Sequence, residues 1–124
     1  MLGANSIIGF VPTRDFERAR AFYEKTLGLH FVSNDGFALV FESASTMIRV
    51  VKVKDFSPQP FTVLGWQVDD IQKKVAALTK RGVVFERYSW FEQDKLGIWN
   101  APGGAQVAWF KDPDGNLLSV SHHV

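Results

Sequence analysis

The sequence predicts an α+β fold made of two similar halves, each with the order strand, helix and three strands. The first observation is an internal repeat, because residues 15–31 (DFERARAFYEKTLGLHF) and 70–85 (DIQKKVAALTKRGVVF) carry the same pattern. The second is that a β-rich run precedes each repeat and further runs follow it. The halves are expected at about residues 5–54 and 61–124, with a linker at 55–60. We expect them to pair into one domain, because neither half could cover both faces of its sheet alone.

Each repeat predicts one amphipathic helix. Asp15 and Asp70 stand where helix N-caps belong, and Gly28 and Gly82 stand where a left-handed residue would end the helix. Apolar residues recur at helical spacing and form one stripe on each helix: Phe16, Ala19, Tyr23 and Leu27 in the first, and Ile71, Val75 and Leu78 in the second. Each stripe is expected to pack against a sheet.

The remaining apolar runs predict strands separated by turns. In the first half they are residues 6–12, 29–34, 37–43 and 46–53, and in the second half 61–68, 83–91, 97–102, 105–111 and 117–123. Asp35-Gly36 reads as a hairpin turn. The turn at 112–115 has a clear physical basis, because Pro113 fixes φ, Asp112 can bond back to the backbone, and Gly115 leaves the turn without steric cost.

Composition excludes several classes of protein. The chain has 124 residues, of which 46% are hydrophobic and 22% charged, as in ordinary globular domains. Its net charge of +1 gives no field that would hold nucleic acid or an anionic membrane. The absence of cysteine excludes thiolate catalysis and thiolate metal sites. The first residues lack a basic segment and a long apolar run, so we expect a cytoplasmic protein.

The repeat, together with RDFERARAFYEKTLGL near the start and WFKDPDGNLLSV near the end, resembles the vicinal oxygen chelate superfamily. That superfamily includes glyoxalase I, bleomycin-resistance proteins, fosfomycin-resistance enzymes and extradiol dioxygenases. The resemblance covers almost the whole chain and implies that the βαβββ modules curl into a cup-shaped mixed sheet. It also implies a homodimer, but it does not select a substrate.

The resemblance also locates the positions at which metal-using members place their ligands, on the first and last strands of each half. These positions fall at Ile8, Arg49, Val63 and Ser119. None of them is an imidazole, carboxylate or thiolate, the groups that repay the dehydration of a divalent ion. We therefore expect no metal and no cofactor. Ser119 either contacts a ligand or is simply a small residue on a crowded strand. Arg49 either receives an anionic oxygen or forms a salt bridge at a surface.

Period-two alternation extends this assignment to neighbouring residues. The side chains expected to line the cup are Ile8, Phe10, Met47, Arg49, Val51, Val63, Gly65, Val107, Trp109, Leu117, Ser119 and Ser121, with Trp99 as a further candidate. Their alternates are expected in the core: Ile7, Val11, Ile48, Val50, Leu64, Trp66, Phe110, Leu118 and Val120. Such a cup suits a planar, partly apolar molecule with an acidic or oxygen-rich edge.

Residues 89–99 (SWFEQDKLGIW) combine aromatic and polar side chains and are a candidate for a mobile rim or a subunit contact. His122 and His123 end the chain, and only His123 shares the cup-facing phase. The leading hypothesis is a metal-independent protein that binds a small anionic or aromatic molecule in the cup or in a dimer cleft. The alternatives are a glyoxalase-like lyase or isomerase that uses Arg49, a dioxygenase-type metal enzyme with non-standard ligands, and a subunit whose cup is filled by its own side chains.

Overall fold

The computed structural model describes residues 1–124, which divide into two compact units, 1–57 and 58–124. Each unit holds a four-stranded mixed sheet and one helical segment, so the predicted α+β architecture of two βαβββ modules is confirmed. The boundary between the units lies within residues 55–60. Neither unit contains a helix long and apolar enough to cross a membrane.

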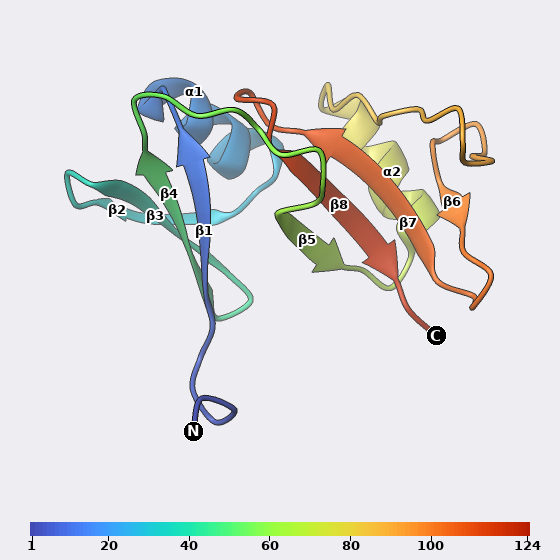
Figure 1. The fold of residues 1–124 in the computed structure, drawn as a ribbon, viewed down its shortest axis with the longest axis horizontal. Helices are drawn as coiled ribbons and strands as arrows, with labels where there is room; N and C mark the ends of the chain where they lie inside the picture. The colour runs from blue at the N-terminus through green and yellow to red at the C-terminus, as the bar shows by residue number, and fades with distance from the viewer. The chain divides into compact units, whose positions relative to one another are not determined.

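The sheet of unit 1 is made of β1 (Ile8–Thr13), β2 (His30–Asn34), β3 (Ala38–Ser43) and β4 (Thr46–Lys52). Their order in the sheet is β1-β4-β3-β2 (Figure 1). Strand β4 is parallel to β1 and antiparallel to β3, and β3 is also antiparallel to β2.

The helical segment of unit 1 begins as predicted and then changes geometry. The Asp15 carboxylate accepts the backbone N–H groups of Glu17 and Arg18, which caps α1 (Phe16–Arg20). The chain continues as a π-helical segment, η1 (Ala21–Thr26), in which the Leu27 N–H donates to the Phe22 carbonyl at 2.9 Å. The expectation of one regular α-helix is therefore wrong beyond Arg20, although Ala19 and Tyr23 are buried as expected. Gly28 follows with φ 78°.

The core of unit 1 lies between this helical segment and one face of the sheet. Tyr23 is fully buried, and its ring lies 5.9 Å from that of Phe41 on β3. The other core residues contributed by β1, β3 and β4 are Val11, Leu39, Ile48 and Val50. Ile7 was expected among them, but it precedes β1 and is 77% exposed, so that expectation is wrong.

Unit 2 repeats the arrangement with the strand order β5-β8-β7-β6, and α2 lies behind β7 and β8 (Figure 1). Asp70 caps α2 through the Lys73 N–H, and Gly82 follows the helix with φ 97°. The core between α2 and the sheet contains Ile71, Val75, Phe110 and Leu118. The elements are β5 (Leu64–Gln67), α2 (Ile71–Lys80), β6 (Trp99–Asn100), β7 (Gln106–Lys111) and β8 (Leu117–His122).

The strand expected at 83–91 does not form. Phe85 makes one isolated bridge to Phe110, and the Glu86 N–H donates to the Trp109 carbonyl at 2.7 Å, after which the chain leaves the sheet. The backbone beyond that point is bonded by side chains of its own loop. Arg87 donates to the carbonyls of Asp94 and Lys95 at 2.6 and 2.7 Å, which turns the chain back toward β6. These side-chain bonds replace the strand ladder that the alternating pattern predicted.

Candidate functional site

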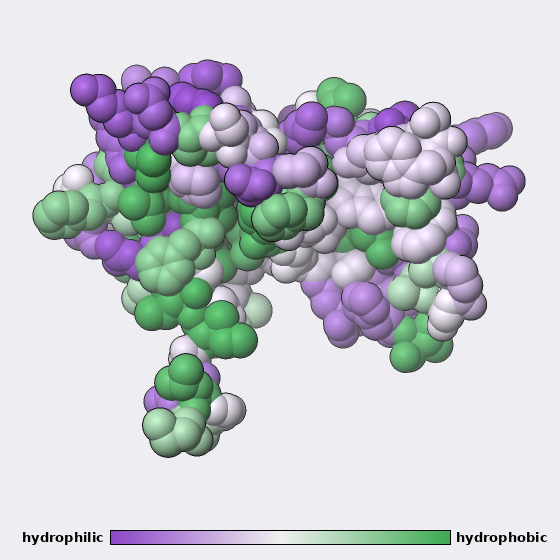
Figure 2. Space-filling model, viewed as in Figure 1, coloured by the Kyte–Doolittle hydropathy of each residue, from purple (hydrophilic) through white to green (hydrophobic).

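The face of the first sheet that lies opposite the helical segment carries exposed apolar side chains. Ile8, Phe10 and Met47 are 46%, 60% and 40% exposed. Ile8 is paired with Met47 and Phe10 with Arg49 in the β1–β4 register, so these four side chains share one face, and Val51 follows on the same face of β4. Figure 2 shows hydrophobic side chains gathered over this part of unit 1. The candidates of the first half therefore lie together.

Arg49 is held by an acidic partner that the sequence did not suggest. Its Nη2 donates to Asp35 Oδ2 at 2.7 Å. Asp35 is fixed in turn, because its Oδ1 accepts the N–H groups of Phe37 and Ala38 at 3.0 and 2.9 Å. The Arg49 hydrogen bond is the main cause that lowers the pKa of Asp35 to about 2, with these N–H groups adding to the effect. The bond uses one edge of the guanidinium and leaves Nε and Nη1 for another acceptor.

On the second sheet, Ser119 lies between Gly65 on β5 and Trp109 on β7, according to the strand registers. Ser119 is 7% exposed. A Cβ atom added at Gly65 would lie 2.6 Å from the Ser119 hydroxyl oxygen, closer than non-bonded atoms can approach. The serine and the glycine therefore fit one another across these strands, which supports the interpretation that Ser119 is a small residue on a crowded strand.

The other candidates of unit 2 surround this pair. Val107 pairs with both Ser121 and Trp99, which places the three side chains on the same face as Trp109 and Ser119. Val63 precedes β5 and is 36% exposed, and its N–H donates to the Leu117 carbonyl at 2.9 Å. Each unit thus presents its own share of the predicted cup residues on one sheet face.

Five aromatic rings form a cluster on this face of the second sheet. Phe91 is stacked on Trp109, with a centroid distance of 5.2 Å and an interplanar angle of 3°. Phe91 also lies 4.3 Å from Trp99, and Tyr88 lies 5.6 Å from Trp109 and 4.9 Å from Trp90. Three of these rings come from residues 88–91, so the segment that fails to form a strand supplies the aromatic surface.

Gln93 and Asp94 fix the loop that carries these rings. The Gln93 amide donates to the carbonyls of Glu86 and Gly97 at 2.9 and 2.8 Å, and its oxygen accepts the Tyr88 N–H at 2.8 Å. Asp94 Oδ1 accepts the N–H groups of Leu96 and Ile98, both at 2.9 Å. The backbone of this loop is therefore bonded by its own side chains. The expectation of a mobile rim or a subunit contact at residues 89–99 stays a prediction.

A pocket of about 690 Å³ opens beside the aromatic cluster. We call it the Lys111 pocket, because Lys111 is the one charged side chain among its lining residues. Lys111 Nζ lies 3.6 Å from Glu86 Oε1, which is too long for a strong hydrogen bond. Burial, and then the charge of Glu86, raise the pKa of Tyr88. The lining consists of residues 58–62, Tyr88, Trp90, Phe91, Trp109, Lys111, Gly115 and Leu117.

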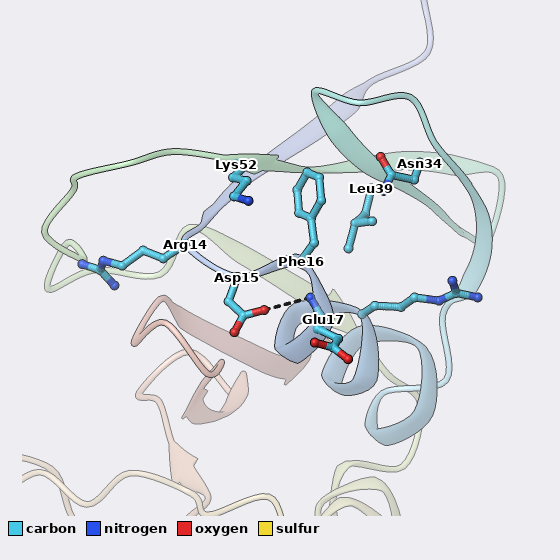
Figure 3. A pocket seen from close by; sticks show the side chains of 8 residues that line it. Arg14, Asp15, Phe16, Glu17, Asn34, Leu39 and Lys52 are labelled. Atoms are coloured by element: carbon cyan, nitrogen blue, oxygen red, sulfur yellow. Dashed lines mark hydrogen bonds between the residues drawn. The ribbon is translucent and has the colours of Figure 1, made fainter.

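A second pocket, of about 490 Å³, lies beside α1 in unit 1, and its charged groups do not converge. Figure 3 shows the Phe16 ring between Lys52 and Leu39, with the Arg14 side chain pointing away from them. Arg14 instead donates to the Phe56 carbonyl and lies over the Phe56 ring. Arg20 is paired with Glu24 at 3.1 Å. Both arginines that line this pocket are therefore engaged elsewhere, and Lys52 Nζ lies 5.6 Å from the centre of the Phe16 ring.

The two terminal histidines bond to neighbouring groups. His122 Nδ1 lies 2.9 Å from the Val68 carbonyl oxygen, and His123 Nε2 lies 3.0 Å from Ser121 Oγ. The structure contains no cluster of three or more His, Cys, Asp or Glu side chains that could hold a metal ion.

Sequence reasoning missed Lys111, Asp35 and the linker residues of the Lys111 pocket. The signal for Lys111 was present, because it follows Val107 and Trp109 in the same strand phase. Asp35 gave no such signal, since its contact with Arg49 depends on the arrangement of the β2–β3 turn beside β4. Trp90 and Phe91 were singled out within residues 89–99, but their place on the sheet face was not predicted, and Tyr88 was not singled out.

A family model described as the Glyoxalase/Bleomycin resistance protein/Dioxygenase superfamily matches residues 5–120. A glyoxalase family protein from Bacillus anthracis has a similar structure, with a TM-score of 0.75 and 18% identity, covering 97% of this chain and 95% of that one. A bleomycin-binding protein in complex with bleomycin gives a TM-score of 0.74 and 20% identity, with coverage of 98% and 100%. An integron cassette protein from V. cholerae has a TM-score of 0.69 and 23% identity, covering 100% of this chain and 98% of that one. A search of curated proteins found no match.

Proposed function

Because this chain belongs to the Glyoxalase/Bleomycin resistance protein/Dioxygenase superfamily, we propose that it binds a small, partly apolar, anionic or aromatic molecule without a metal. Binding takes place in a cup or in a cleft between two copies of the chain. The protein is a cytoplasmic homodimer in this proposal, and binding itself, rather than turnover, is its activity.

One observation carries the proposal: the four positions that the family resemblance assigns to metal ligands hold Ile8, Arg49, Val63 and Ser119. Alkyl groups supply no lone pair, and a guanidinium repels a cation. The Ser119 hydroxyl adjoins Gly65, where an added Cβ would lie 2.6 Å from it, and a single neutral hydroxyl is a weak ligand for a divalent ion. This donor set does not fit a divalent ion, and no step of the proposed function uses one.

The nature of the ligand is supported by the surfaces around these positions. The exposed side chains of Ile8, Phe10 and Met47 offer apolar area, and a molecule that covers them gains roughly 25 cal/mol for each Å² removed from water. Arg49 lies beside Phe10 with two donor groups left for an anionic oxygen. Among the structural neighbours, one binds bleomycin, a precedent for binding by this fold.

A second candidate function is a lyase or isomerase of the glyoxalase type, favoured by the same free edge of Arg49. A guanidinium fixed by Asp35 could stabilise an enolate or carboxylate oxygen in place of a metal ion. A dioxygenase-type metal enzyme with ligands from other positions is the remaining alternative.

The test is a panel of carboxylates, phosphates, phenols and neutral aromatic compounds, screened by thermal shift and followed by calorimetric titration. We expect saturable binding of anionic or aromatic members to metal-free protein. If no member of the panel binds, the proposed function is wrong. Turnover of a bound compound that is lost in Arg49→Gln would favour the second candidate, whereas binding without turnover favours the first.

A further inference from the structure

We propose that the Lys111 pocket of unit 2 binds a flat aromatic molecule that carries one anionic group. This inference rests on the proposed function and names a ligand class and a place for it. The pocket lies at the end of the sheet face where Lys111 pairs with Leu117, beside the position of Ser119.

The aromatic walls favour a planar ligand. The Trp90 side chain is 72% exposed and that of Phe61 is 58% exposed, and both line the pocket. Phe91 and Trp109 are already stacked with nearly parallel planes, 3° apart, and Tyr88 adjoins both Trp90 and Trp109. A ring that packs against these side chains gains stacking as well as apolar burial. A volume of about 690 Å³ is suitable for such a molecule.

Hydrogen bonds and packing hold both walls of the pocket. Gln93 bonds to three backbone groups of the loop, and Arg87 bonds to two more. On the opposite side, the linker contributes Pro58 and Pro60, whose rings restrict the backbone, and Pro58 packs 3.2 Å from a Cβ position at Gly115. Because both walls are held in place, the protein loses little conformational entropy when a ligand binds.

The charge of the pocket selects the anion. Lys111 is its one charged lining residue, and Gln59 and Thr62 add neutral polar groups. Glu86 lies outside the lining and is separated from Lys111 Nζ by 3.6 Å, so the ammonium group can turn its hydrogens to a carboxylate in the pocket. Arg49 is less free to turn its donors, because its Nη2 is bonded to Asp35 Oδ2 at 2.7 Å. A cationic ligand would meet an unfavourable charge at Lys111.

Three probes with one ring system test this assignment: 2-naphthoate, neutral 2-naphthamide and the cation 2-naphthylmethylammonium. Each is titrated into nitrogen-labelled protein and followed by NMR. We expect 2-naphthoate to bind most tightly and to shift the amide signals of residues 59–62, 88–91 and 111. Lys111→Gln should weaken 2-naphthoate binding about ten-fold and leave 2-naphthamide unchanged, because only the acid uses the charge. Lys111→Arg should restore most of the binding.

Matched controls separate local effects from general ones. Lys80→Gln removes an exposed lysine at the end of α2, and Phe37→Ala removes an aromatic ring that is 78% exposed in unit 1. Neither should alter 2-naphthoate binding, whereas Trp90→Ala should weaken it several-fold. Equal affinity for the acid and the amide, or no effect of Lys111→Gln, would overturn the assignment. Shifts confined to the surroundings of Arg49 would also overturn it, while leaving the proposed binding function in place.

Discussion

Arg49 and Asp35 form an ion pair across the β2–β3 turn and β4, with 2.7 Å between Nη2 and Oδ2. The pair places a fixed guanidinium beside the apolar surface of the first sheet. The Asp35 carboxylate also neutralises the charge of Arg49, so Arg49 can contribute to anion binding only through its remaining donors.

The first prediction concerns the acid titration of this pair. The pKa of Asp35 is lowered from 3.8 to about 2 in the folded protein, first by Arg49 and then by the N–H groups of Ala38 and Phe37. A carboxyl group whose pKa is lowered by folding stabilises the folded protein at pH values above its unfolded pKa. That stabilisation is lost as the pH falls from the unfolded pKa through the folded pKa. Arg49→Gln should raise the pKa of Asp35 only part of the way to 3.8, because the backbone bonds remain. An NMR titration of the carboxyl carbon measures this. An unchanged pKa in the variant would show that the ion pair does not form in solution.

The second prediction concerns the close fit of Gly65 and Ser119. Gly65→Ala places a methyl group 2.6 Å from Ser119 Oγ and should lower the free energy of unfolding by about 1–3 kcal/mol. The same change in a Ser119→Ala background should cost clearly less, because the next atoms lie at 3.5 and 3.9 Å. Urea denaturation of the four proteins in this cycle gives the coupling. Additive effects would mean that the two residues do not adjoin.

The third prediction concerns the aromatic loop. Gln93→Ala removes the amide that bonds to the backbone of Tyr88, Glu86 and Gly97, and should destabilise the protein by about 1–2 kcal/mol. The stacked rings should also lose part of their fixed geometry, which near-ultraviolet circular dichroism reports. Glu92→Ala, a change on the neighbouring residue, serves as the control and should leave the spectrum intact. Identical spectra for the Gln93 variant and the unmodified protein would contradict the role assigned to Gln93.

The fourth prediction concerns Tyr88, whose pKa is raised by burial and then by Glu86. Because the folded pKa lies above the ordinary 10.0, the protein should lose stability as the pH rises past that value. Glu86→Gln should lower the pKa of Tyr88 without returning it to 10.0, since burial is the larger cause. Ultraviolet absorbance titration, with Tyr88→Phe to identify the signal, measures the shift. A larger drop, down to the ordinary value, would assign the shift to charge rather than burial.

Most of the fold could be predicted from local signals. Asp15 and Asp70 cap their helices, and Gly28 and Gly82 follow them with positive φ, because capping depends on residues within one turn. The 83–91 segment could not be predicted in this way. Its alternation indicates a strand, but Arg87 and Gln93 bond to backbone groups up to eight residues away and draw the chain out of the sheet.

The sequence predicted the site residues only where the alternation along a strand determines which face of the sheet a side chain occupies. Alternation placed Phe10 with Arg49 and Trp109 with Ser119, and the registers of β1–β4 and β7–β8 agree with that placement. The pairing of Arg49 with Asp35 and the closure of the Lys111 pocket by residues 58–62 depend on tertiary arrangement. No local pattern reports such contacts.

Elemental analysis of untagged protein tests most directly whether the protein works without a metal. The analysis is followed by thermal-shift titration with nickel, zinc, manganese and iron(II). We expect less than stoichiometric metal and no metal-dependent shift in Tm, with stabilisation by anionic aromatic compounds instead. One equivalent of bound metal together with a rise of several degrees in Tm would contradict it, and would mean that ligands come from residues other than Ile8, Arg49, Val63 and Ser119.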